Sequence, residues 1–254
     1  MDSGSRKIRL KFIISYHGGN YQGWQTQKIG TGVQSIIESV IRNLFPEAGS
    51  LHGSSRTDTG VHALGMAAHL ELPANALHMP PRKIRLAINA NLPSDIRIVS
   101  VRRVPSKFHA QFDAKGKQYQ YRIWNHAAMN PLLQGLAWHV PVQLDLDQMQ
   151  KASVHFLGER DFQSVASNRN YVYENTVRTL TRCDVRKKGC EYKIVIEGNG
   201  FLYKMCRGIV GTLVAVGKRK WTPDLIPILL SEKNRSVAGM NAPACGLTLH
   251  KVFY

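Results

Sequence analysis

The sequence predicts an α+β fold built from two compact halves. Segments with strand-like alternation mix with segments of helical period in no regular strand-helix order, and the 254 residues suffice for one large domain or two small ones. Neither a low-complexity linker nor a short internal repeat separates these segments. We expect a boundary near Pro105, which gives halves of residues 1–105 and 106–254 with a ligand-binding cleft between them.

The first half begins with a strand and a helix. Residues 7–16 alternate apolar and basic side chains, which is typical of a half-buried strand. After the turn-rich residues 17–32, apolar side chains recur at helical spacing from Val33 to Leu44, and Thr31 with Gln34 indicates a capping box. An amphipathic helix is expected there.

The rest of the first half contains a loop, two strands and a short helix. Residues 51–60 are rich in Ser, Thr and Gly and predict a loop, and residues 61–72 predict the strand that follows. A short helix is expected over 82–90 and a strand over 96–104.

The second half repeats this mixture of elements. The pattern predicts strands over 117–124, 178–187 and 191–197, and a helix over 146–156. Residues 201–217 carry one apolar helical stripe, with Lys204 and Arg207 away from its centre. That helix should pack through one face and present cations beside it.

The chain is strongly basic. It has 34 Lys and Arg against 17 Asp and Glu, a formal charge of +17 at pH 7. Such an excess favours a nucleic-acid partner, with an anionic membrane surface as the second choice and scattered, solvated cations as the simplest alternative. The basic residues form short clusters along the chain, as a broad phosphate-binding surface requires: 6–11, 82–85, 102–103, 115–122, 182–188 and 204–220.

Cysteines and histidines do not predict a metal site. The four cysteines, at positions 183, 190, 206 and 245, lack zinc-ligand spacing, and no H-E-x-x-H pair occurs. The N-terminal residues 1–11 lack a long apolar run, and no stretch approaches the roughly 18 apolar residues that span a bilayer. We expect reduced thiols, no metal and a soluble intracellular protein, with the cytoplasm favoured over an organelle or the nucleus.

The densest polar cluster is the loop of residues 53–63. It places the carboxylate of Asp58 between Arg56 and Gly60, which suggests catalysis. An Asp followed closely by Thr and Gly is also common in turns and helix caps, and spacing alone favours that structural interpretation.

The eight residues from Arg56 to Ala63 resemble the R-T-D-x-G-V-H-A signature of TruA-type tRNA pseudouridine synthases, the tRNA pseudouridine 38-40 synthases. Further ordered motifs cover both halves of the chain. They are Y-x-G-W-Q at 21–25, N-A-N-L-P at 89–93, F-H-A at 108–110, Y-x-Y at 119–121, F-x-x-x-M-x-R-x-I-V-G at 201–211 and A-P-x-x-G-L-x-L at 242–249.

The resemblance implies a fold and an activity. The fold would be the pseudouridine synthase α+β architecture, with two similar halves whose mixed or antiparallel sheets meet at a basic catalytic cleft and whose helices lie outside. The reaction would convert uridines 38, 39 and 40 of the tRNA anticodon stem-loop to pseudouridine without a cofactor. A homodimer that binds tRNA across both subunits is also implied.

Asp58 would supply the essential carboxylate. Breaking the bond from N1 to C1′ develops positive charge at the sugar, which a buried carboxylate stabilises or attacks. Attack at the sugar, attack at the base and abstraction of a sugar proton all remain open. The resemblance gives Arg207 as the cation that keeps Asp58 ionised, and a phosphate contact is the alternative.

Three further residues would handle the substrate. Arg56 resembles the residue that helps flip the uridine out of the stem, and Tyr119 the residue that stacks on uracil and takes part in proton transfer at C5. Leu247 would close the other side of the uracil pocket, although core packing explains a strand leucine equally well. Trp24 and Gln25 have no chemical role in this interpretation and are expected to support the loop structurally.

The chain departs from the family pattern at two positions. Ser55 stands where many members have Gly, and Gln111 stands where Arg usually follows F-H-A, which removes a cation and bears on RNA contacts. A non-catalytic RNA-binding or chaperone protein with the same basic cleft is the main alternative. A metal-dependent nuclease is disfavoured because no cluster of acids accompanies Asp58.

Overall fold

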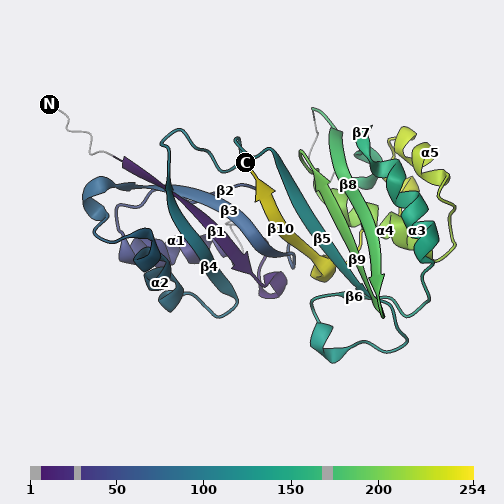
Figure 1. Cartoon of the computed structure of the whole chain (residues 1–254), viewed down its shortest axis with the longest axis horizontal. Helices are drawn as coiled ribbons and strands as arrows, with labels where there is room; N and C mark the ends of the chain where they lie inside the picture. The colour runs from purple at the N-terminus through teal and green to yellow at the C-terminus, as the bar shows by residue number, and fades with distance from the viewer. Residues whose placement is uncertain (1–6, 26–29, 168–173) are drawn as a thin grey trace. The chain divides into compact units, whose positions relative to one another are not determined.

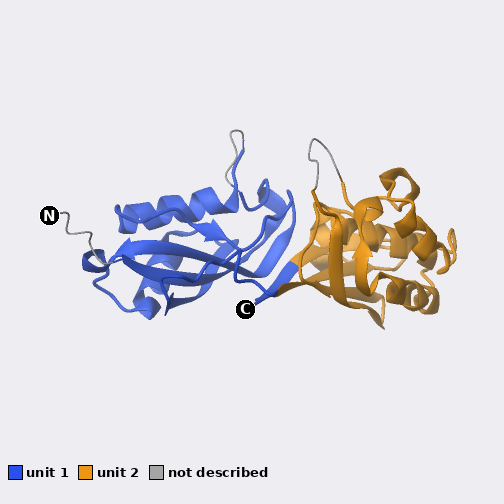
Figure 2. Cartoon of the chain, turned by 90° about the horizontal axis from the view of Figure 1, so that it is seen from above, with its two compact units in different colours: residues 1–115, 249–254 blue, residues 116–248 orange. Residues whose placement is uncertain are grey.

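The computed structural model describes residues 7–25, 30–167 and 174–254 (Figure 1). Arg6, in the first predicted basic cluster, lies outside these residues. The chain forms two compact units, residues 1–115 with 249–254 (unit 1) and residues 116–248 (unit 2), as Figure 2 shows. Unit 1 thus includes residues 106–115, beyond Pro105.

Hydrogen bonds explain why residues 106–115 lie with unit 1. The Arg9 guanidinium donates to the Phe108 carbonyl oxygen at 2.6 Å. The backbone NH of Ala110 donates to His69 Nδ1 at 3.1 Å, and that of Lys115 to the Phe253 carbonyl oxygen at 2.9 Å. The last contact also holds the C-terminal strand in unit 1.

In unit 1 the strands are neighbours in the order β4-β1-β3-β10, and β10 belongs to this unit from Leu249 on. β1 pairs antiparallel with both β3 and β4, and the short β2 pairs with β3. On β1, Leu10, Phe12 and Ile14 are buried at alternate positions, as the sequence pattern predicted. The strands are β1 (Lys7–Tyr16), β2 (His52–Gly53), β3 (His62–Pro73), β4 (Ile96–Val104) and β10 (Leu247–Phe253).

Two helices complete unit 1: α1 (Val33–Leu44) and α2 (Pro81–Asn91). α1 buries Val33, Ile37, Val40 and Ile41, which confirms its predicted apolar face. The predicted capping box is wrong, because Gly32 is the N-cap and makes no side-chain cap bond. Thr31 therefore lies outside the cap, and Gln34 donates instead to the Leu51 carbonyl oxygen at 3.0 Å.

In unit 2 the strands are neighbours in the order β5-β9-β8-β7, and the short β6 pairs parallel with β5. The strands are β5 (Gly116–Trp124), β6 (Trp138–His139), β7 (Gly158–Asp161), β8 (Val177–Lys188) and β9 (Glu191–Gly198). The helices are α3 (Leu146–Ser153), α4 (Met205–Gly217) and α5 (Leu225–Ser231). The helix predicted over 146–156 ends as a 3-10 turn at Val154–Phe156.

The expectation that the helix of residues 201–217 packs through one face is wrong. α4 is buried on nearly every side, and only Arg207 and Ala215 among its residues are not buried. Gly208 and Gly211 let it approach the backbone carbonyls of Val165 and Met240, where a Cβ would collide. The helix begins at Met205 because Lys204 has a left-handed φ of 59°.

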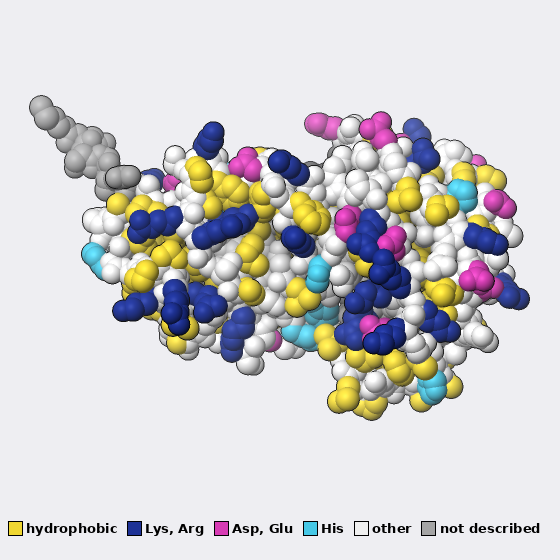
Figure 3. All heavy atoms as spheres, viewed as in Figure 1, with side chains coloured by type: hydrophobic (Ala, Val, Ile, Leu, Met, Phe, Trp, Pro, Cys, Tyr) yellow, Lys and Arg dark blue, Asp and Glu magenta, His cyan; other side chains and the backbone are white. Residues whose placement is uncertain are grey.

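The surface carries Lys and Arg side chains on both units, as the spread of clusters in the sequence predicted (Figure 3). Within the described residues, no helix combines the length and the apolar character needed to cross a bilayer.

Candidate active site

Asp58 lies in the loop of residues 54–61, which connects β2 to β3. The loop closes with a turn, in which the backbone NH of Val61 donates to the Asp58 carbonyl oxygen at 3.1 Å and Gly60 has a φ of 79°. The Asp58 side chain is half-buried and the Arg56 side chain is exposed. The turn thus presents a carboxylate beside a solvent-facing cation.

A single buried side-chain contact fixes Thr57, the residue before Asp58. The hydroxyls of Tyr16 and Thr57 lie 2.8 Å apart, and both side chains are buried. Burial raises the pKa of Tyr16 well above its usual value, so this phenol stays neutral. Because a buried hydroxyl without a partner is costly, the contact holds Thr57 in place.

The backbone of residues 17–24, here called the bracing segment, supports the loop on both sides of Asp58. The backbone NH of Trp24 donates to the Thr57 carbonyl oxygen at 3.3 Å, and that of Gly60 donates to the Tyr21 carbonyl oxygen at 3.3 Å. Gly23 has a φ of 87°, and a Cβ there would collide with the Thr57 carbonyl. Only glycine permits this approach.

Side chains outside the loop hold the bracing segment in turn. The backbone NH of Gly18 donates to His62 Nδ1 at 2.9 Å. The Tyr21 hydroxyl donates to Asp95 Oδ1 at 2.5 Å, and the backbone NH of His17 donates to the Asp95 carbonyl oxygen at 2.9 Å. The position of the Asp58 loop therefore depends on polar contacts from distant parts of unit 1.

Unit 2 carries the other predicted site residues, beginning with Tyr119 on β5. Its ring is buried and meets the ring of Phe201 edge to face, with centroids 5.0 Å apart. Tyr119 and Tyr121 point to the same face of the sheet because they lie two residues apart on one strand. The Tyr121 hydroxyl donates to the Pro243 carbonyl oxygen at 2.7 Å.

Arg207 on α4 is tied to the same segment of unit 2. Its Nε donates to the Ala242 carbonyl oxygen at 2.7 Å, and the backbone NH of Ala242 donates to the Arg207 carbonyl oxygen at 3.0 Å. Arg207 and Cys245 both lie close enough to Tyr121 to influence its pKa, which burial raises. These contacts leave the guanidinium half-buried at a fixed place on unit 2.

Leu247 begins β10 and is buried, with 5% of its surface exposed. The preceding Gly246 packs against the Tyr121 ring, which a Cβ would strike. The segment of residues 242–247 thus joins Arg207, the Tyr121 ring and Leu247 within unit 2. The structure places Arg56 and Asp58 on unit 1, and Tyr119, Arg207 and Leu247 on unit 2.

Sequence reasoning expected Trp24 to support the loop, and its backbone NH does so, but it missed Tyr16 and Asp95. Tyr16 reads as the last residue of a strand, and Asp95 as part of a turn before the next strand. Tyr16 and Thr57 lie 41 positions apart, and Tyr21 and Asp95 lie 74 apart. The local sequence signal for this bracing is Gly23 in the Y-x-G-W-Q motif, because a glycine at such a position indicates a close approach of another backbone segment.

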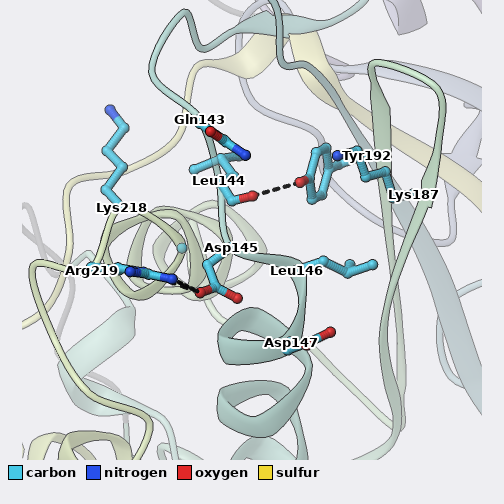
Figure 4. A pocket seen from close by; sticks show the side chains of 10 residues that line it. Gln143, Leu144, Asp145, Leu146, Asp147, Lys187, Tyr192, Lys218 and Arg219 are labelled. Carbon is cyan, nitrogen blue, oxygen red and sulfur yellow. Dashed lines mark hydrogen bonds and ion pairs between the residues drawn. The ribbon is translucent and has the colours of Figure 1, made fainter.

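Unit 2 also has a pocket of about 560 Å³ where the N-terminus of α3 meets the C-terminus of α4 (Figure 4). Asp145 caps α3 by accepting from the Gln148 NH at 3.1 Å and pairs with Arg219 at 2.9 Å, and these contacts lower the pKa of Asp145. The Tyr192 hydroxyl donates to the Leu144 carbonyl oxygen at 2.7 Å. None of the predicted site residues lines this pocket.

Comparison with known proteins connects these features to one enzyme family. A family model described as tRNA pseudouridine synthase matches residues 12–113 and 152–254. The chain is 41% identical to tRNA pseudouridine synthase A of Geotalea uraniireducens, over 97% of this chain and 99% of that protein. The protein of the same name from Acetivibrio thermocellus is 42% identical over 96% of this chain and 99% of its own length. The chain, with its mixed α+β fold, therefore belongs to the tRNA pseudouridine synthase family of isomerases.

Proposed function

We propose that this protein isomerises uridine to pseudouridine at positions 38, 39 and 40 of the tRNA anticodon stem-loop, with the Asp58 carboxylate as the catalytic group and no cofactor. The complete R-T-D-x-G-V-H-A sequence on the braced loop is the observation that carries the proposal. The charge of +17 supports a polyanionic substrate.

The reaction exchanges one bond to C1′ for another. The bond from N1 to C1′ breaks, the detached uracil turns, and C5 forms a new bond to C1′. The proton on C5 is then lost and N1 gains one, so the product is an isomer of the substrate. A carboxylate serves this sequence by attack at C1′, by attack at the base or by removal of a sugar proton.

We assign Arg207 the role of keeping the Asp58 carboxylate ionised when substrate excludes water. Its hydrogen bond to the Ala242 carbonyl oxygen supports this role, because it fixes the direction of the guanidinium. A phosphate contact by Arg207 is the alternative assignment.

The remaining residues handle the uridine. Arg56, exposed beside Asp58, would enter the space that the flipped nucleotide leaves. Tyr119 would stack on the uracil and move a proton at C5, and its contact with Phe201 fixes the plane of its ring. Leu247 would cover the opposite face of the base, which keeps water from the detached uracil.

We further propose that the protein is a cytoplasmic homodimer whose two subunits together bind one tRNA. The two halves expected from the sequence would correspond to units 1 and 2. The family resemblance supports the dimer, and the cytoplasm is where tRNA is used. An activity assay separates this proposal from a non-catalytic RNA-binding protein, the alternative that the sequence alone left open.

The test uses unmodified tRNA labelled with tritium at C5 of uridine. Release of tritium to water measures the new bond at C5, and carbodiimide treatment followed by primer extension locates each pseudouridine. The proposal expects stops at positions 38, 39 or 40. Tight binding of tRNA without tritium release would instead identify an RNA-binding protein.

A further inference from the structure

Four aromatic side chains of unit 1 form a stack that the proposed chemistry does not use: His52, His69, His109 and Phe112, here called the aromatic stack. The ring centroids of His52 and His69 lie 5.1 Å apart, those of His69 and His109 4.6 Å, and those of His109 and Phe112 4.2 Å. His109 and Phe112 are close to parallel, at 25°, whereas His69 and His109 meet edge to face, at 66°. His69 is 3% exposed and Phe112 is 77% exposed, and His52 is exposed as well. The stack therefore joins a buried ring, His69, to the surface at Phe112.

A tight turn over residues 109–113 holds the outer end of the stack. The backbone NH of Asp113 donates to the His109 carbonyl oxygen at 3.0 Å, and Asp113 Oδ2 accepts from the His109 NH at 2.9 Å. His109 Nδ1 accepts from the backbone NH groups of Gln111 and Phe112 at 3.2 Å and 3.3 Å. His69 Nδ1 anchors the turn through Ala110. The Phe112 ring is thus fixed in advance, rather than mobile at the end of a loose loop.

The two histidines nearest Phe112 along the stack, His69 and His109, have lowered pKa values. Burial is the largest cause of the shift of the His69 pKa to about 4; His109, His52 and Arg9 act in the same direction and Glu71 opposes them. Desolvation also lowers the pKa of His109, with His52 and Arg9 acting in the same direction and Asp113 opposing them. Lowered pKa values favour the neutral form of His69 and His109, which pack behind Phe112.

The segment of chain that carries Phe112 is rich in exposed cations. Residues 102–115 contain the exposed cations Arg102, Arg103, Lys107 and Lys115, against one acid, Asp113. A single exposed Phe is common on protein surfaces and does not by itself indicate a binding site. The core of a protein-protein interface is depleted in charged residues, so a protein partner does not explain the surplus of cations in this segment. A binding site for an unpaired nucleotide combines an aromatic ring, which stacks on the base, with nearby cations, which contact the phosphates. An exposed Phe on a basic segment offers this combination.

We propose that Phe112, backed by His109, is a stacking site for an unpaired nucleobase of the RNA substrate, other than the uridine that reacts. The identity of the RNA rests on the proposed function. His52 lies on β2, six positions before Asp58. That stretch of chain spans at most about 20 Å, so one RNA can reach both places.

The test compares the affinity of unmodified tRNA for the wild-type protein and for Phe112→Ala, Phe112→Leu and Phe112→Tyr, by filter binding at several salt concentrations. Loss of stacking should weaken binding about 5-fold to 100-fold in the Ala and Leu variants, and Tyr should restore it. The dependence of log affinity on log salt should stay at the wild-type slope, because no phosphate contact is lost. Leu86→Ala, at a residue 54% exposed on α2, is the matched control and should bind like wild type.

Three results would overturn the inference. Wild-type affinity in Phe112→Ala, or in Phe112→Leu, would show that no aromatic stacking takes place. A change in the oligomeric state of Phe112→Ala without RNA would show that this surface meets a second copy of the chain. Because tritium release by the wild type tests the proposed function separately, an active enzyme that is indifferent to Phe112 would refute the stacking site alone.

Discussion

In unit 1, Asp58 sits on a loop whose position depends on a few hydrogen bonds, whereas in unit 2, Arg207 sits on a helix enclosed by packing. The loop is held by the Tyr16 hydroxyl and by backbone NH groups of the bracing segment. α4 is held because its glycines allow neighbouring backbone to touch it. The position of the loop should therefore change when a single polar atom is removed. The stability of the helix should fall when a single methyl group is added.

The largest expected effect on the free energy of unfolding concerns the helix α4. In Gly211→Ala the new methyl group meets the Met240 carbonyl, and backbone has little freedom to move aside. We expect a loss of about 3 kcal/mol in the free energy of unfolding, which lowers the melting temperature by about 10 °C. Thermal denaturation checks this, with Ala215→Ser, at a half-buried position of α4, as the control. Equal melting temperatures for the two variants would contradict enclosure by packing.

The next effect concerns the cation that α4 carries. Arg207→Lys keeps the charge but removes the Nε donor to the Ala242 carbonyl oxygen, so the charge is no longer directed. We expect kcat/KM for tRNA to fall about 100-fold with a change in the free energy of unfolding of about 1 kcal/mol. Lys204→Arg, in the adjacent position before the helix, serves as the control. An Arg207→Lys enzyme with normal kcat/KM would show that only the charge matters.

The loop should respond to the loss of one hydroxyl. Tyr16→Phe leaves the buried Thr57 hydroxyl without this partner, which should cost about 1–2 kcal/mol in the free energy of unfolding and lower kcat about 10-fold with little change in KM. Removing both hydroxyls in Tyr16→Phe/Thr57→Val should cost less stability than the sum of the two single changes. Additive losses in this double-mutant cycle would mean that the two hydroxyls do not depend on each other.

The last effect depends on pH, grows as the pH falls and belongs to unit 1. Because burial holds the pKa of His69 near 4 in the folded chain, the unfolded chain binds this proton first as the pH falls below about 6.5. Stability should be full above that pH and should decline toward pH 4, by at most about 1.4 kcal/mol per pH unit from this group. His69→Asn keeps an acceptor for the Ala110 NH without titrating. Melting temperatures between pH 7 and pH 4.5 should therefore decline less steeply in the variant, and an identical decline would assign the effect to other groups.

Local pattern predicted the long strands, and the resemblance to family motifs indicated the site residues, which stay a prediction. Neither predicted the contacts that position these residues. The alternation in β1 and β4 predicted their bounds because alternate apolar residues of each strand are buried. It did not predict that Lys11, on the other face of β1, is buried as well. The bracing contacts join positions far apart in the sequence, as Tyr21 and Asp95 do, and no local pattern encodes them. The apolar pattern underestimated the burial of α4. Its glycines do not count as apolar positions in that pattern, yet they allow neighbouring backbone to cover nearly every side of the helix.

The central claim is that the carboxylate of Asp58 carries out the isomerisation, and Asp58→Asn tests it most directly because the amide keeps the shape and removes the charge. The measurement is single-turnover tritium release from C5-labelled tRNA, with Glu47→Gln, an exposed carboxylate of unit 1, as the matched control. We expect release to fall by about 10⁴-fold in Asp58→Asn, with tRNA binding and melting temperature retained, and to stay normal in Glu47→Gln. Release by Asp58→Asn within about 10-fold of the wild-type rate would contradict the account.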